Sequence, residues 1–427
     1  METDSRSGHG FGLMKSWRRV TLGVILGMAL LLRLYGAFSA LPPEIRGDAK
    51  KYEEIGWNIA SGRGFSLTWE GNRILPTAQV VGPLYPLFIA LVYKVAGHQP
   101  DAVRLLQCFL GVLVCLVLYE LGRLLFDSNI GLLVAGFGAV YPLLIRHSYF
   151  GGPVFLMTEN LFALLLFLSV LALVHVQRYP TFSNQLVAGL CLGLSALTRA
   201  SILAFPVALF IWLGLLRRWS WLVVLRMVGT VTIWMLLVIA PWTWRNYQVF
   251  HQVVPISTLG GSPLWDGNNP LARGGDAPAV PLPKHLTGLS PGQSWKYQYP
   301  RDEVILDRLC YQASWEALAA NPRRVPWLMG KKVLVFWMFF DDSKTRQVNW
   351  AFLFAGLFAL VGWWSARREP FRWLPVIVPA AYLTLIAMVF LPAPRYRAPV
   401  EPLLLILAAA GVAVILRLVA RAGDSSG

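Results

Sequence analysis

The chain has 427 residues, of which 56% are hydrophobic and only 14% are charged. Soluble globular domains carry about 25% charged residues, so this composition excludes a water-soluble enzyme of this size, and it equally excludes a disordered, collagen-like or coiled-coil chain. The net charge of +16 comes from basic residues that lie between apolar runs. Such residues set membrane topology and contact anionic lipid, so no nucleic-acid partner is predicted.

Apolar runs predict ten membrane-spanning helices, because a span needs about 20 mostly apolar residues. In chain order they cover 20–40, 103–122, 129–146, 158–177, two short helices within 184–216, 221–241, 349–366, 372–391 and 399–418. The pair within 184–216 turns at Arg199, since a continuous helix would place this guanidinium in the middle of the bilayer. The shorter runs 83–96 and 333–340 are predicted to lie at the membrane surface. A further helix is expected near 301–320 in the largest outer loop, with Pro322 after it. We therefore expect an all-α polytopic membrane protein with amphipathic surface helices in the first and largest outer loops.

Basic residues predict the orientation of these spans. They gather in the N-terminal tail and after every even-numbered span, and the positive-inside rule places both sets in the cytoplasm. Both termini are then cytoplasmic, and the candidate site faces the outer (periplasmic, extracellular or lumenal) side of a membrane expected to be the bacterial inner or plasma membrane. Three parts follow: a seven-span module at 1–241 with its first outer loop at 41–102, a large outer loop at 242–349, and a three-span module at 350–427.

Two acidic residues are candidates for catalysis. Asp48 follows Gly47 and opens a predicted helix over 48–60, where it is either an N-cap or a general base, two compatible roles. Glu159 opens the fourth span on the outer side. An acid in a first helical turn is favoured by the helix dipole, but acids at membrane depth are often functional.

Four arginines fall on the outer side, where the positive-inside rule depletes them: Arg199, Arg245, Arg395 and Arg397. Each alone is consistent with a side chain that reaches toward lipid headgroups. Together they suit a phosphate, which arginine binds in a bidentate manner. The scattered histidines and four cysteines form no spacing typical of a metal site, so no metal and no cofactor are predicted.

The sequence resembles the GT-C superfamily of membrane glycosyltransferases, specifically its dolichyl-phosphate-mannose protein mannosyltransferase-like branch. The matching stretches run in order from residue 47 to residue 411 and read GDAKKYEEIGWNIASGRGF, GPLYPLFIAL, MTENLFALLLF, GLSALTRAS, APWTWRNYQVF with VVPISTLGGSPLWDGNNP, and RYRAPVEPLLLILAAAG. The resemblance implies a module of seven spans with two helices in the first outer loop. It also implies that Asp48 is the catalytic aspartate of the first loop, that Glu159 is the acid of the second, and that Arg245 and the Arg395–Arg397 pair lie near the donor phosphate.

One stretch departs from the related lipid A aminoarabinose transferases. They carry a Glu-Lys pair before the proline-rich start of the second loop helix, where this chain reads Gln79-Val80-Val81-Gly82-Pro83. A metal site or lysine clamp of that type is therefore not expected.

The predicted function is an inverting transfer of a sugar from a polyprenyl-phosphate-sugar donor to an acceptor hydroxyl on a glycan, lipid or protein. Asp48 would be the base, with Glu159 orienting the acceptor or Asp48, and the arginines would stabilise the phosphate. Tyr52, Tyr396 and Asn246 are predicted to contact substrate. The alternative is a polytopic transporter or lipid flippase. It is disfavoured because the chain has no internal repeat and its charged candidates gather at one face.

Overall fold

The computed structural model describes residues 5–39, 44–69, 72–145, 153–275, 280–288, 298–338 and 348–424. Within them, six helices are long and apolar enough to cross a membrane: α1 (Ser5–Phe38), α4 (Pro100–Leu125), α7 (Glu159–Arg178), α10 (Trp221–Phe250), α16 (Pro370–Val389) and α17 (Leu404–Asp424) with the short η4 (Glu401–Leu403) before it. Shorter apolar helices fill the other four predicted positions: α5 (Ser128–Val140) with α6 (Pro142–Ile145), α8 (Phe182–Thr198), α9 (Phe205–Leu215) and α15 (Trp350–Ala366). The predicted all-helical polytopic fold is confirmed.

Helix α10 continues nine residues past the predicted end of its run at residue 241. Pro241 lies inside this helix and cannot donate a backbone hydrogen bond, which is why the sequence predicts an end there. The extension is held from the side: the Trp242 indole donates to the Ile256 carbonyl at 2.7 Å, and Asn246 is buried. Tertiary contacts therefore override the proline.

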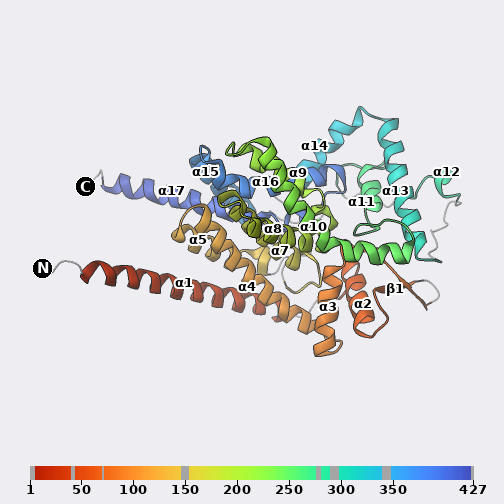
Figure 1. Ribbon diagram of the computed structural model, residues 1–427, viewed down its shortest axis with the longest axis horizontal. Coiled ribbons are helices and arrows are strands. Elements are labelled where there is room, and N and C mark those ends of the chain that lie inside the picture. Colours follow the sequence, from red (N-terminus) through yellow and green to blue (C-terminus); the bar gives the residue numbers. More distant parts are fainter. Residues whose placement is uncertain are drawn as a thin grey trace.

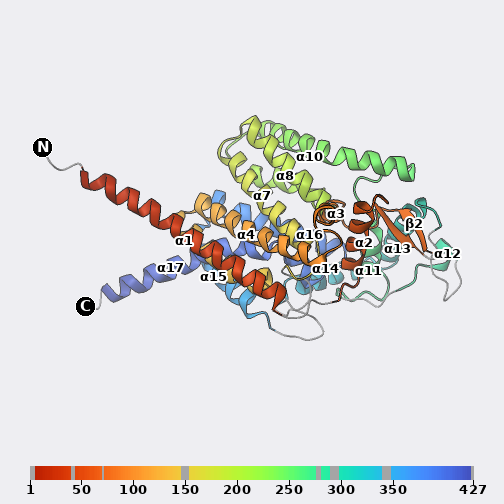
Figure 2. The same ribbon diagram turned by 90° about the horizontal axis from the view of Figure 1, so that it is seen from below.

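The two termini lie at one end of the molecule, and the loop helices lie at the other (Figure 1). Helices α7, α8 and α10 run side by side between these ends, and α1 packs on α4 and α5 (Figure 2). Helices α15 and α17 cross closely at two glycines, since a Cβ added at Gly362 would lie 1.9 Å from the Leu407 carbonyl oxygen and one at Gly411 2.1 Å from that of Phe358. Small residues at such crossings let membrane helices approach each other.

The first outer loop holds α2 (Asp48–Ala60), a hairpin of β1 (Ser66–Trp69) and β2 (Arg73–Pro76), and α3 (Leu84–Ala96). Helix α2 has the predicted bounds. The two-stranded antiparallel hairpin pairs Ser66 with Pro76 and was not predicted. Helix α3 covers the predicted surface run and is two-sided, with Ile89 buried and Leu91 and Val95 exposed. Helix α2 packs against it so closely that a Cβ at Gly56 would lie 2.5 Å from the Ile89 side chain.

The large loop folds into α11 (Gly261–Asn268), α12 (Lys284–Thr287), α13 (Arg301–Ala320) and α14 (Arg324–Phe336). Helix α13 runs over the predicted residues. The predicted surface run 333–340 begins within α14, and residues 339–340 lie outside the described residues. Besides η4, the described residues hold two further short 3₁₀ turns. η2 (Ala200–Ile202) lies between α8 and α9, and η3 (Pro394–Arg397) precedes the last span.

Candidate active site

Two ion pairs join segments that are far apart in the sequence. Arg395 in η3 places Nη2 3.1 Å from the Asp48 Oδ2 atom, across a separation of 347 residues. Arg199, at the turn between α8 and α9, places Nη1 3.1 Å from Oε1 of Glu159 at the start of α7. The loop turns therefore bring a carboxylate and a guanidinium together twice.

Asp48 is the first residue of α2 rather than its cap. The N-cap position is Gly47, whose φ of 59° suits glycine and which has no side chain that could cap the helix. The Asp48 side chain is 41% exposed and reaches toward Arg395. Its carboxylate is thus accessible, whereas the Glu159 side chain is only 6% exposed.

Tyr396 links the two pairs. The Arg395 guanidinium donates to the Tyr396 hydroxyl at 3.1 Å and lies 5.0 Å from the centre of its ring, while Arg199 lies 5.2 Å from the same ring centre. The negative face of the aromatic ring stabilises both cations.

Tyr52 lies close to both carboxylates. Burial raises the pKa of Tyr52, and the nearby carboxylates of Asp48 and Glu159 add to this effect. Tyr52 is buried and packs edge-on against Tyr85, with ring centres 5.5 Å apart.

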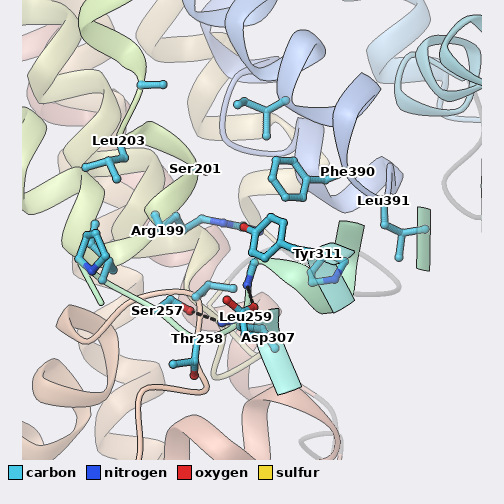
Figure 3. Close-up of a pocket in the computed structure, with 18 of the residues that line it drawn as sticks. Arg199, Ser201, Leu203, Ser257, Thr258, Leu259, Asp307, Tyr311, Phe390 and Leu391 are labelled. Atoms are coloured by element: carbon cyan, nitrogen blue, oxygen red, sulfur yellow. Dashed lines mark hydrogen bonds between the residues drawn. The ribbon is translucent and has the colours of Figure 1, made fainter. Parts of the chain in front are cut away.

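A cavity of about 650 Å³ opens beside Arg199 and Tyr396. Its walls are mostly apolar, and Leu203, Leu383 and Ile386 come from the η2–α9 region and α16. Figure 3 shows Arg199 and Leu203 on one side of this space, Phe390 and Leu391 on another, and Asp307 and Tyr311 of α13 on a third. The cavity therefore joins a cationic end, an apolar lining and an acidic wall.

Arg245 and Asn246 are used for other contacts. Arg245 donates to the carbonyl oxygens of Thr77 and Phe65, both at 2.9 Å, and to the Asn246 side chain at 3.0 Å. Asn246 is fully buried and donates to the Val254 carbonyl at 3.0 Å. These two residues pin the first loop and the chain after α10 to the helix, and their predicted substrate contacts stay predictions.

Arg397 faces away from this cluster. Its Nε atom lies 2.7 Å from Oε2 of Glu401, its Nη1 atom donates to the carbonyl oxygens of Phe336 and Met338, and its side chain is 2% exposed. The structure thus separates the two arginines that flank Tyr396. Arg395 reaches toward Asp48, and Arg397 anchors the turn.

Three buried charged residues hold the loops together through contacts that the sequence did not predict. Glu303 of α13 accepts hydrogen bonds from the Ala78 amide at 3.0 Å and the Thr258 hydroxyl at 2.9 Å. Burial raises the pKa of this carboxyl. Lys332 of α14 is fully buried and donates to Asn268 at 2.9 Å, and burial lowers its pKa to about 8. The third residue is Glu401, which lies four residues after Arg397, a spacing that itself indicates an ion pair on a helical turn.

No group of three or more His, Cys, Asp or Glu that could hold a metal occurs in the described ranges. His147, a histidine that falls on the outer side of the predicted spans, lies outside these ranges. The expectation that the protein needs no metal stays a prediction.

Comparison with known proteins supports the resemblance drawn from the sequence. The family model for dolichyl-phosphate-mannose-protein mannosyltransferase matches residues 80–244. No curated protein matches the sequence. The archaeal oligosaccharyltransferase AglB from Archaeoglobus fulgidus, solved with an inhibitory peptide and a dolichol-phosphate, has a similar structure. It shows a TM-score of 0.60 at 11% identity over 97% of this chain and 52% of that one.

The apo form of the oligosaccharyltransferase from the same archaeon gives a TM-score of 0.58 at 13% identity, over 96% of this chain and 52% of that one. ArnT from Cupriavidus metallidurans, solved with undecaprenyl phosphate, has a TM-score of only 0.39 at 14% identity, over 93% of this chain and 78% of that one. The chain spans about half the length of the oligosaccharyltransferases. At these identities the likeness establishes the fold alone, which is that of the helical, polytopic membrane part of these oligosaccharyltransferases.

Proposed function

We propose that this protein is a glycosyltransferase that moves a sugar from a polyprenyl-phosphate-sugar donor to an acceptor hydroxyl, with inversion at the sugar C1. The observation that supports it most is the Asp48–Arg395 contact at 3.1 Å beside the Arg199–Glu159 pair. A base and two phosphate-binding cations are the groups that this reaction needs at one place.

The cationic end of the cavity suits the donor phosphate. Arg199 lines the cavity directly, and the Arg395 guanidinium lies 5.0 Å from the centre of the same Tyr396 ring. Arginine binds phosphate oxygens through parallel N–H groups, and the bonds strengthen where water is excluded. Glu159 is buried and paired with Arg199, so its proposed role is to hold that guanidinium in place.

The apolar lining suits the polyprenyl tail. Leu203, which lies between η2 and α9, and Leu383 and Ile386 of α16 line the cavity. Many further apolar side chains on the outside of the bundle are exposed, as expected for helices in contact with lipid. A soluble sugar nucleotide would gain nothing from such walls. A lipid-linked donor gains from every apolar group that it covers.

Asp48 is proposed as the general base. As the acceptor oxygen attacks C1, Asp48 takes the hydroxyl proton, and the C1–O bond to the phosphate breaks. Both bonding electrons leave with the lipid phosphate, whose negative charge Arg199 and Arg395 stabilise. No second acid is required, because a phosphate monoester leaves as an anion, unlike the alcohol released by a glycosidase.

The site lies at the end of the molecule opposite both termini (Figure 1). Together with the basic residues predicted to be cytoplasmic, this supports action on the outer face of the membrane. The acceptor is proposed to be a hydroxyl of a glycan, lipid or protein that reaches this face.

The test is an assay of the purified protein in liposomes with radiolabelled undecaprenyl-phosphate hexoses and, separately, nucleotide hexoses. We expect label to move to an acceptor from at least one lipid donor and from no nucleotide sugar. Arg395→Gln should weaken donor use. Its control is Arg367→Gln, which also removes a guanidinium from above an aromatic ring, 4.0 Å from the centre of Trp364. Passage of the lipid across the bilayer with its C1–O bond intact would instead identify a flippase.

A further inference from the structure

The wall of the cavity that α13 forms carries a carboxylate, Asp307, with a tyrosine one turn further along the helix, Tyr311. Both face the turn over residues 257–260 (Figure 3). The donor phosphate does not bind at this wall, because the carboxylate of Asp307 repels its negative charge. The wall must serve a different part of a ligand, or serve only the fold.

Two glycines set the direction of the Asp307 side chain. A Cβ at Gly260 would lie 2.2 Å from the Tyr311 hydroxyl oxygen, and one at Gly261 would lie 2.2 Å from the Asp307 carbonyl oxygen. Because neither glycine has a side chain, the turn lies directly against α13. The Oδ1 atom of Asp307 therefore accepts hydrogen bonds from the amides of Gly260 at 3.0 Å and Gly261 at 2.6 Å.

The second oxygen of Asp307, Oδ2, is left for a ligand. Within the described part of the chain no donor is recorded for it, and the side chain lines the cavity. Burial raises the pKa of Asp307 to about 6, so the group is ionised at neutral pH and only accepts hydrogen bonds. The space before it is bounded by the rings of Tyr311 and Phe390.

A fixed acceptor beside aromatic rings suits a ligand with hydroxyl donors and an apolar face, which describes a sugar ring. The cationic end of the same cavity suits a phosphate. We propose that Asp307 and Tyr311 bind the hydroxyl groups of the donor sugar while its phosphate lies at Arg199. This subsite deepens the proposed function and depends on it. It makes α13 of the large loop the element that selects the sugar.

The experiment compares binding of undecaprenyl phosphate with binding of undecaprenyl-phosphate mannose and glucose to the purified full-length protein. Asp307→Asn keeps an oxygen for the two glycine amides but removes the charge. It should weaken binding of the preferred sugar lipid by about 10- to 100-fold, the contribution of one hydrogen bond to a charged group, and leave undecaprenyl phosphate binding unchanged. Arg199→Gln should weaken binding of all three lipids.

The matched control is Asp302→Asn on the same helix. Asp302 also accepts two backbone amides, from Gln298 at 2.7 Å and Tyr299 at 2.8 Å, but it does not line the cavity. It should bind all three lipids as the unmodified protein does. If Asp307→Asn does not fold, Tyr311→Phe removes a hydroxyl from the same wall and should show the same selective loss, to a smaller degree.

Two results would overturn the subsite in different ways. If the unmodified protein binds the sugar lipids no better than undecaprenyl phosphate, and the Asp307 and Tyr311 variants match it, Asp307 only caps α11 and the proposed function stands. If the unmodified protein binds none of the three lipids, the proposed function fails and the subsite fails with it.

Discussion

Removing the Glu401 carboxylate should destabilise the protein more than any surface substitution. Arg397 and Glu401 form a pair 2.7 Å apart whose side chains are each 2% exposed, and the Tyr141 hydroxyl donates to the other oxygen of Glu401. Glu401→Ala leaves the Arg397 charge buried without its partner. Breaking a buried pair in this way costs about 3–5 kcal/mol. Glu401→Gln, which keeps an acceptor of the same shape, should cost less.

The assay is thermal unfolding of the detergent-solubilised protein, followed by fluorescence of its 18 tryptophans. The matched control is Glu369→Ala. Glu369 pairs with Arg372 at 3.0 Å on the surface, with side chains 42% and 33% exposed, and such a pair contributes about 0–1 kcal/mol. Since Arg395 and Tyr396 share the η3 turn with Arg397, transfer activity should fall with stability. Equal unfolding temperatures for Glu401→Ala and Glu369→Ala would refute this reasoning.

Four further substitutions separate the roles of the loop residues. The Asp307 carboxyl, with its pKa raised by burial from 3.8 to about 6, contributes stability that is present below about pH 4 and lost as the pH rises through 6. Asp307→Asn should therefore match the unmodified protein near pH 4 and exceed its stability by about 3 kcal/mol above pH 7, as unfolding at both pH values will reveal. Gly261→Ala should destabilise by about 1–3 kcal/mol or more, because its Cβ meets backbone, while Gly260→Ala meets only the end of a side chain and should cost less in the same unfolding assay. Arg245→Gln breaks two hydrogen bonds to the first loop, so it should lower the unfolding temperature and leave the KM for the donor unchanged. A raised KM with an unchanged unfolding temperature would show instead that Arg245 binds the donor phosphate.

The sequence predicts the fold where local signals are strong. Glycines end α2 and a proline follows α13, so both helices have the predicted bounds. The cost of a mid-bilayer charge predicts the turn at Arg199. The same reasoning places Asp48, Glu159, Arg199 and Arg395 at one end of the bundle, where the structure brings them together.

The partners of individual side chains could not be predicted, because they depend on contacts between distant segments. Arg245 and Arg397 look like Arg395 in the sequence, but in the structure they make other contacts. Arg245 donates to carbonyl oxygens of the first loop, and Arg397 donates to the Phe336 carbonyl and pairs with Glu401. Asp307 lies on a helix with mixed polar and apolar residues, where an acid is normally solvent-exposed. Only the close approach of the turn at Gly260 and Gly261 makes it a buried acceptor.

The central claim is that Asp48 is the base of a sugar transfer from a lipid phosphate. The direct measurement is the rate of transfer at saturating donor by Asp48→Asn, compared with Asp127→Asn. Asp127 is also a carboxylate at a helix start, where it accepts the amides of Asn129 and Ile130, and asparagine caps equally well. We expect Asp48→Asn to fold and to transfer about 10²–10⁴ times more slowly, the usual contribution of a general base, and Asp127→Asn to keep full activity. Full activity in Asp48→Asn would contradict the account.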